Sequence, residues 1–204
     1  MKQILCFGDS NTYGLIPGTT NQRYGWGTRW TSILDDKVRT KGYRVIEEGL
    51  CGRTTVFDDP FRTERRGTEM LPAILESHRP VDTIVLMLGT NDCKSVYSAT
   101  PEVIGQGIEQ LLDQINTVNP DAKILLVSPI YLGERILIRN SIRILSKYHG
   151  ICPGCMRKSL EEEIFLIFRL QNLPDREKPI RSIWMNWDIA DLQMQFMKSL
   201  QDEA

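Results

Sequence analysis

The sequence predicts an α/β protein whose parallel sheet is covered by helices on both faces. Short apolar runs that stop at glycine or at a Ser-Pro pair alternate along the chain with amphipathic helical patterns. Such alternation is typical of parallel strands joined by right-handed crossovers. The length of 204 residues, with 41% hydrophobic and 25% charged residues, fits a single domain around one buried core.

Four runs have the composition of buried strands, because apolar residues follow one another without the alternation of a half-exposed strand. They are residues 3–7 before Gly8, residues 43–46 near Gly49, residues 83–88 before Gly89, and residues 123–127 before Ser128. Helical patterns lie between these runs. One contains Trp30, Ile33, Leu34 and Val38. The longest, with the stripe Ile104, Ile108, Leu111, Leu112 and Ile115, begins at Pro101 and ends before Pro120.

Charge and hydropathy exclude several classes of partner. The 25 basic and 26 acidic side chains are interspersed, so the net charge of −1 includes no one-signed block that would bind nucleic acid or an anionic membrane. No apolar run approaches the roughly 20 residues that span a bilayer, and no secretory signal is recognisable. A cytoplasmic location is therefore expected, and the sequence leaves a homo-oligomer open.

The five cysteines do not form a secreted disulfide framework, because their number is odd and their positions are scattered. They are Cys6, Cys51, Cys93, Cys152 and Cys155, and reduced thiols are expected. The last two have the spacing of a redox or half-zinc motif. No second pair and no following βαβ pattern supports that motif, so we interpret the spacing as chance.

Three segments are candidates for a functional site, because the site of a parallel sheet lies beyond the carboxyl ends of its strands. They are residues 8–12 (the first segment), residues 49–55 (the second segment) and residues 89–92 (the third segment). All three are rich in glycine and small polar residues, which suit backbone N–H groups that must approach a ligand closely. We expect them to meet at one site.

Ser10 has the position of a nucleophile, because it follows a strand and a glycine and should lie exposed at the start of a helix. The alternative is that Ser10 only N-caps this helix. Acyl transfer also needs donors for the oxygen that becomes negative, and the Ser10 N–H, the Gly52 N–H and the Asn91 side chain can supply them. Taken singly, Gly52 indicates a positive φ and Asn91 a turn residue. Together at one end of a sheet, the three favour acyl transfer.

These segments resemble a known family. Gly8-Asp9-Ser10, Gly52 and Gly89-Thr90-Asn91-Asp92 resemble the first three blocks of the SGNH (GDSL) hydrolases. Residues 47–55, followed by Asp58-Asp59-Pro60, resemble the arylesterase and acyltransferase branch. The resemblance runs from the N-terminus to about Glu134 and is lost over residues 135–204, within what we expect to be one domain.

The resemblance implies a flavodoxin-like three-layer α/β/α sandwich with a parallel sheet. It also implies a serine esterase that acts on small acyl esters and needs no metal or cofactor. By this resemblance Ser10 is the nucleophile, and Ser10, Gly52 and Asn91 form the oxyanion hole. Tyr13 and Cys51 match positions that line the acyl pocket.

The family's Asp-x-x-His block, which supplies the base and the carboxylate that orients it, is missing. The histidines are His78 and His149, and neither follows an aspartate by three residues. We interpret His78 as a solvated residue at a helix end, and we do not expect His149 to reach Ser10. The acyl-enzyme chemistry of this chain should therefore be impaired.

The codons of the C-terminal third offer an explanation. Beyond Glu134 the sequence fits neither a helical stripe nor a strand alternation. If every codon starts one base earlier, the genetic code forces residues 184–188 to read Asp-Glu-Leu-Gly. One codon choice at each neighbouring position extends this to His-Met-Asp-Glu-Leu-Gly-His, and the junction of Pro179 and Ile180 can encode an aspartate three codons before the first histidine. We interpret residues 135–204 as a frame-shifted SGNH tail, with poor packing expected from about residue 136.

Three functions remain open. The first is an esterase of small acyl esters. The second is a non-catalytic SGNH-like binding protein that keeps the oxyanion pocket without its base. The third is a thiol or metal protein that uses Cys152 and Cys155, which the zinc content of the purified chain would decide.

Overall fold

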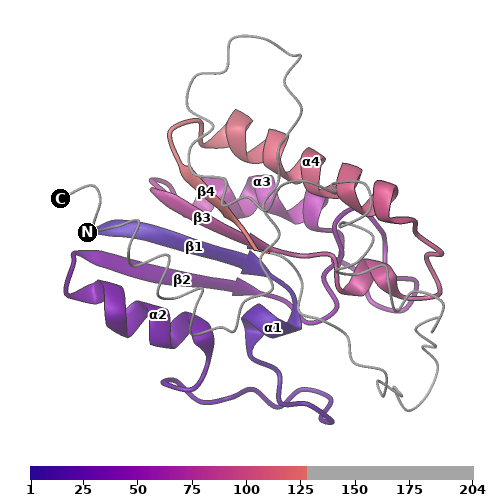
Figure 1. Ribbon diagram of the computed structural model, residues 1–204, viewed down its shortest axis with the longest axis horizontal. Helices are drawn as coiled ribbons and strands as arrows, with labels where there is room; N and C mark the ends of the chain where they lie inside the picture. Colours follow the sequence, from indigo (N-terminus) through magenta and orange to yellow (C-terminus); the bar gives the residue numbers. More distant parts are fainter. Residues whose placement is uncertain (128–204) are drawn as a thin grey trace, which may run out of the picture.

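The computed structural model describes residues 1–127 of the chain. Within them, one sheet has the strand order β2-β1-β3-β4 (Figure 1). The strands are β1 (Lys2–Gly8), β2 (Tyr43–Gly49), β3 (Thr83–Met87) and β4 (Lys123–Leu126). All neighbouring strands are parallel. The chain starts in the middle of the sheet and extends it on both sides, which is the flavodoxin-like order and confirms the predicted fold class.

The helices also match the sequence patterns. They are α1 (Ser10–Tyr13), α2 (Trp30–Arg39), α3 (Gly67–Ser77) and α4 (Pro101–Val118), with a short 3-10 helix, η1 (Asn91–Cys93). α4 begins at Pro101, where Thr100 is the N-cap and its side chain accepts a hydrogen bond from the Val103 N–H, and it ends before Pro120 as expected.

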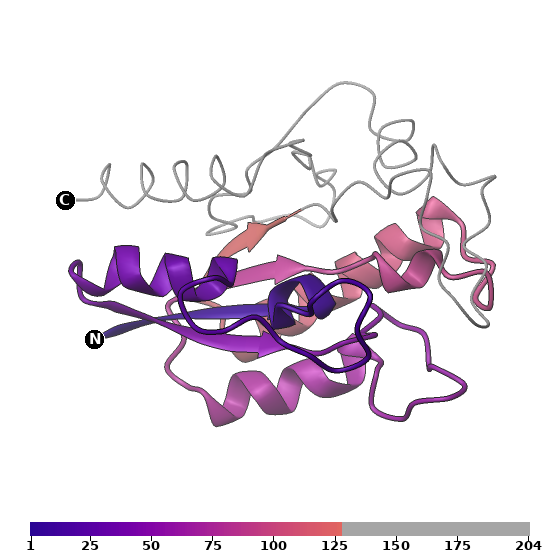
Figure 2. The ribbon, with the colours of Figure 1, turned by 90° about the horizontal axis from the view of Figure 1, so that it is seen from below.

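The helices cover both faces of the sheet, and Figure 2 shows α2 and α3 on opposite sides. Successive residues of β1 point to opposite faces. Ile4 and Cys6 pack with Leu34 and Val38 of α2. Leu5 and Phe7 point to the other face and pack with α3 and α4. Two apolar layers therefore enclose the sheet, as a three-layer sandwich requires.

Several expectations lie outside the described residues. These are the histidine His149, the cysteines Cys152 and Cys155, and the frame-shifted interpretation of residues 135–204. Within residues 1–127, the cysteines Cys6, Cys51 and Cys93 are free thiols, as expected. No helix in this part of the chain combines the length and apolarity needed to cross a membrane.

Candidate active site

The structure brings the first and second segments together at the carboxyl end of the sheet. Gly8, the last residue of β1, pairs with Gly49 of β2 on one side and with Met87 of β3 on the other. The Leu50 N–H donates a hydrogen bond to the Gly8 carbonyl at 3.1 Å. The second segment therefore starts directly beside the residue that leads into Asp9 and Ser10.

Ser10 is the first residue of α1 and is partly exposed. The N-cap is Asp9, whose Oδ1 accepts a hydrogen bond from the Asn11 N–H at 2.8 Å. The alternative role of Ser10 as the cap is therefore wrong, because Asp9 already fills it. Asp9 is 1% exposed, and this burial raises the pKa of its carboxyl group against the hydrogen bond from Asn11. The Ser10 hydroxyl is left for other chemistry.

Two glycines let α1 press against the ends of the strands. A Cβ on Gly49 would lie closer to the Tyr13 backbone nitrogen than van der Waals contact allows, and a Cβ on Gly8 would overlap the Thr12 hydroxyl. The neighbour of Gly49 is backbone, which cannot rotate out of the way. Glycine at these positions therefore sets how closely Ser10 approaches the second segment.

The second segment turns sharply at Gly52, which has a φ of 88° as the positive-φ interpretation predicts. Arg53 follows it and is 3% exposed. Its Nη1 donates to the Gly8 carbonyl at 2.9 Å and also to the Glu48 carbonyl. The Arg53 side chain, for which the sequence predicted no role, therefore lies between the ends of β1 and β2 at the site.

The third segment is tied to the second by two side chains. Asn91 donates through Nδ2 to the Arg53 carbonyl at 3.0 Å. Asp92 is fully buried, and its Oδ1 accepts from the Thr55 N–H at 2.9 Å and from the Thr55 hydroxyl at 2.5 Å. Burial raises the pKa of Asp92 to about 6, and the hydrogen bonds from Thr55 oppose that rise. Asn91 is thus held at the carbonyl of Arg53, the residue that follows Gly52.

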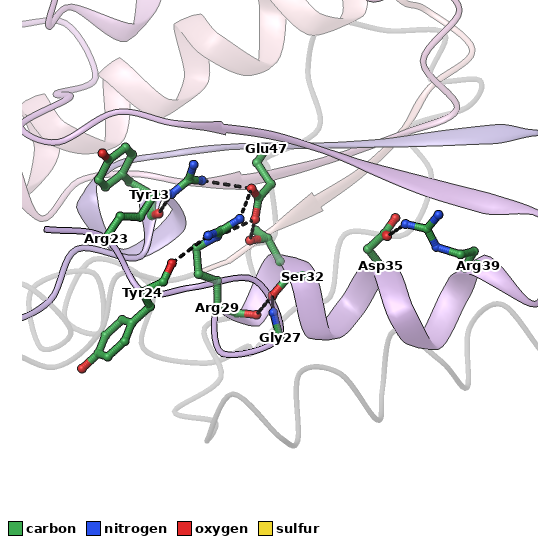
Figure 3. Close-up of polar contacts among 10 residues, drawn as sticks. Tyr13, Arg23, Tyr24, Gly27, Arg29, Ser32, Asp35, Arg39 and Glu47 are labelled. Carbon is green, nitrogen blue, oxygen red and sulfur yellow. Dashed lines mark hydrogen bonds and ion pairs between the residues drawn. The ribbon is translucent and has the colours of Figure 1, made fainter.

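Tyr13 lies beside a charged network that Figure 3 displays. The Arg23 guanidinium lies 4.5 Å from the centroid of the Tyr13 ring, and its Nε donates to the Tyr13 carbonyl at 2.5 Å. Glu47 of β2 accepts hydrogen bonds from Arg23 at 3.0 Å and from Arg29 at 2.8 Å (Figure 3). This network fixes the chain that follows α1.

Cys51 is partly buried in the second segment, and its carbonyl accepts a hydrogen bond from Arg65 Nε at 3.0 Å. Burial raises the pKa of the Cys51 thiol, although the positive charges of Arg62 and Arg65 oppose this. The thiol is therefore mostly protonated at neutral pH, which suits a wall of a pocket better than a nucleophile.

His78 is the C-cap of α3, as its interpretation as a helix-end residue predicts. It is not simply solvated, however, because its Nε2 lies 2.8 Å from Glu48 Oε1 and its side chain is only 31% exposed. That part of the prediction was wrong. His78 is also the only histidine among residues 1–127, and its imidazole is engaged with Glu48, not with Ser10.

The roles of Arg53, of the pairing of Asp92 with Thr55 and of the Glu47 network were not predicted from the sequence. A local signal existed for Arg53, since a charged residue stood between Gly52 and Thr54 in a segment already assigned to the carboxyl end of the sheet. That signal does not predict that Arg53 bonds to the carbonyls of Gly8 and Glu48. No cluster of three or more metal-ligating side chains lies within the described part of the chain.

Comparison with known proteins identifies the family. The profile of the GDSL-like Lipase/Acylhydrolase family matches residues 6–150 and so extends past Glu134. None of the curated proteins matches the chain.

Solved structures similar to the chain include two esterases. A carbohydrate acetylesterase from Sinorhizobium meliloti shares 34% identity and has a TM-score of 0.65, covering 81% of this chain and 83% of its own. The native aryl esterase of M. smegmatis shares 30% identity and has a TM-score of 0.69, covering 97% of this chain and 99% of its own. The chain belongs to the GDSL-like lipase/acylhydrolase family, has the SGNH hydrolase fold, and is by family a carboxylic ester hydrolase.

Proposed function

We propose that this chain is a serine esterase of small acyl esters in which Ser10 forms an acyl-enzyme. The observation that carries the proposal is the meeting of three segments beside Gly8. Ser10 begins α1 with its capping role taken by Asp9. Leu50 bonds to Gly8, and Asn91 bonds to the carbonyl that follows Gly52. A nucleophile and several N–H donors at one end of a sheet support acyl transfer.

In this mechanism the Ser10 Oγ attacks the ester carbonyl carbon and its proton passes to a base. The carbonyl oxygen becomes negative and accepts hydrogen bonds from the Ser10 N–H, the Gly52 N–H and the Asn91 side chain. Each such donor contributes roughly 10²–10³ in rate. Collapse of the intermediate expels the alcohol and leaves the acyl group on Ser10, from which water or a second alcohol removes it.

The substrates we propose are esters with a small acyl group. Two similar structures are named as an aryl esterase and a carbohydrate acetylesterase, so acetyl esters of aromatic or sugar alcohols are the first to test. Tyr13 and Cys51 would line the acyl pocket. Arg23 covers the Tyr13 ring, and Arg65 bonds to the Cys51 carbonyl.

No general base for Ser10 is identified among the described residues. Among residues 1–127 the one imidazole is held by Glu48, and the full sequence has no Asp-x-x-His block. This favours a second candidate, a binding protein that keeps the oxyanion pocket without turnover. Under our proposal, the written chain keeps only the rate that donors and substrate binding provide, roughly 10³–10⁴ over water, while missing triad members cost on the order of 10⁶.

The test is hydrolysis of 4-nitrophenyl acetate by three proteins: the chain as written, its Ser10→Ala variant as the blank, and a chain whose reading frame is restored after Glu134. We expect barely detectable Ser10-dependent turnover in the first and a large gain in the third. No Ser10-dependent turnover in either chain would support the binding protein. Rapid turnover by the written chain would show that another residue is the base, and His149 would be the first to replace.

A further inference from the structure

Arg53 is an unusual side chain for its place in the fold. It is 3% exposed, and within residues 1–127 it forms no ion pair with a carboxylate. Burial lowers the pKa of Arg53 to about 10, so the guanidinium is still charged at neutral pH. Its Nε is also buried without a hydrogen-bond partner in that part of the chain. A buried charge with incomplete partners is costly, so a fold that keeps one needs a reason.

The guanidinium joins the ends of two strands. Its Nη1 donates to the carbonyl of Gly8, where β1 ends, and to the carbonyl of Glu48, near the end of β2. The guanidinium carbon lies 4.0 Å from the centroid of the Phe7 ring, which fixes the plane of the group. The side chain thereby attaches the second segment to the residue that leads into Ser10.

The backbone of Arg53 completes the arrangement. Its N–H donates to the Leu50 carbonyl at 3.0 Å, which closes the turn that contains Gly52. Its carbonyl accepts the hydrogen bond of Asn91 Nδ2 at 3.0 Å. The Gly52 turn, the Asn91 amide and the start of the Ser10 segment therefore all make contact with this one residue.

We propose that Arg53 is the positioning residue of the oxyanion site, an inference that rests on the proposed function. The guanidinium sets the position of the second segment relative to Gly8, and through its carbonyl the same residue sets the direction of the Asn91 amide. Arg53 itself does not touch the substrate. We expect lysine not to replace it, because an ammonium group has no planar face to stack on Phe7 and so cannot hold the donor nitrogen in the same place between the two carbonyls.

A purely structural role would be the competing explanation, and Arg53→Lys with two control variants separates it from positioning. Arg53→Lys keeps the charge but loses the planar contacts. Leu75→Ala removes a fully buried side chain on α3, away from the carboxyl end, and serves as a control that lowers stability by packing alone. Arg44→Met removes a second arginine, which donates to the Gln3 side chain on neighbouring β1.

The first readout does not depend on turnover. Nuclear magnetic resonance would follow hydrogen exchange of the Asn91 side-chain amide and of the Leu50 backbone amide, which donates to the Gly8 carbonyl, in the original chain. We expect exchange of both amides to rise about tenfold or more in Arg53→Lys and to stay unchanged in Leu75→Ala and Arg44→Met. Each protein is measured at the same number of degrees below its own midpoint of thermal unfolding. Unchanged exchange in Arg53→Lys would overturn the proposal, whatever the esterase assay shows.

The second readout is a double-mutant cycle with Asn91→Ala in the frame-restored chain. Arg53→Lys should lower kcat about 10- to 100-fold with little change in KM, because an oxyanion contact acts only in the transition state. The double variant should be only a few-fold worse than Asn91→Ala, since both changes affect the same donor. Fully multiplicative losses would overturn the proposal. An inactive frame-restored chain would instead contradict the proposed function and leave the exchange experiment to decide on Arg53.

Discussion

The two faces of the sheet and its carboxyl end are stabilised in different ways. On the faces, fully buried Leu5 and Ile84 pack among other apolar side chains under α3 and α4. At the carboxyl end, Asp9, Arg53 and Asp92 are buried to 3% exposure or less and are held by hydrogen bonds. The faces need apolar residues of about the right size, whereas the carboxyl end needs particular partners at particular distances.

This difference has a functional meaning. Buried charges usually cost stability relative to apolar side chains of similar volume, so their concentration at one end of the sheet is typical of a site. The faces supply the stability that offsets this cost. Variants on the faces should therefore change stability without changing chemistry, whereas variants that displace Ser10 at the carboxyl end should reduce activity by more than their loss of stability explains.

The largest effect on stability is expected on a face. Ile84→Ala removes a fully buried side chain from the layer under α3 and α4, which should cost about 2–5 kcal/mol of the free energy of unfolding. Urea denaturation would measure this cost. The Ser10-dependent rate per folded molecule should stay the same, and a parallel loss of that rate would contradict the separation of faces from carboxyl end.

A smaller loss of stability but a larger loss of activity is expected for Gly49→Ala. The new Cβ would overlap the backbone of Tyr13, so α1 and Ser10 must move away from β2. Overpacking of this kind costs about 1–3 kcal/mol. The Ser10-dependent rate of the frame-restored chain should fall at least about 100-fold, because misplacement by an ångström is enough. Retention of that rate would show that Ser10 is not positioned by this contact.

Asp92→Asn tests the buried carboxylate through pH. Burial raises the pKa of Asp92 to about 6 from its ordinary 3.8, so its favourable contribution to folding is complete below about pH 4 and is lost as the pH rises through 6. Asparagine does not titrate and can still accept the hydrogen bonds of Thr55. Urea denaturation of both proteins from pH 4 to 7 should show the original chain losing roughly 1–3 kcal/mol relative to the variant. A difference that stays constant with pH would contradict this.

The smallest effect is expected at Glu47, whose side chain is 12% exposed beside Arg23 and Arg29. Burial opposes its ionisation, but the hydrogen bonds from Arg29 and Thr31 prevail and lower the pKa of Glu47. Glu47→Gln should cost about 1 kcal/mol at low salt and less at high salt, because salt screens the attraction to Arg23 and Arg29 that the variant removes. The same denaturation at two salt concentrations measures it, and an unchanged salt dependence would be the contrary result.

The sheet was largely predictable, because strands that are buried on both faces consist of consecutive apolar residues. The predicted end of the second strand, Ile46, was too early, since β2 continues through Glu47 and Glu48 to Gly49. Charged residues end an apolar run in the sequence. In the structure, their side chains bind Arg29 and His78, partners that lie 18 and 30 residues away and that the run does not reveal.

The site was predictable in part. The rule that functional segments follow parallel strands was enough to expect Ser10, Gly52 and Asn91 at one end of the sheet. It could not indicate which charged residues hold them, because Arg53 bonds to a carbonyl 45 residues away and Thr55 to a carboxylate 37 residues away. Backbone carbonyls have no sequence signature, so the role of Arg53 required the folded structure.

The central claim is that Ser10 carries the acyl group, and trapping that group tests it most directly. The frame-restored chain, the written chain and Ser10→Ala would each be mixed with 4-nitrophenyl acetate, quenched in acid, digested with trypsin and analysed by mass spectrometry. We expect acetyl on Ser10 in the peptide that ends at Arg23, formed fast in the frame-restored chain, slowly in the written chain, and never in Ser10→Ala. Acetyl found on Cys51 instead, with turnover unaffected by Ser10→Ala, would contradict the account.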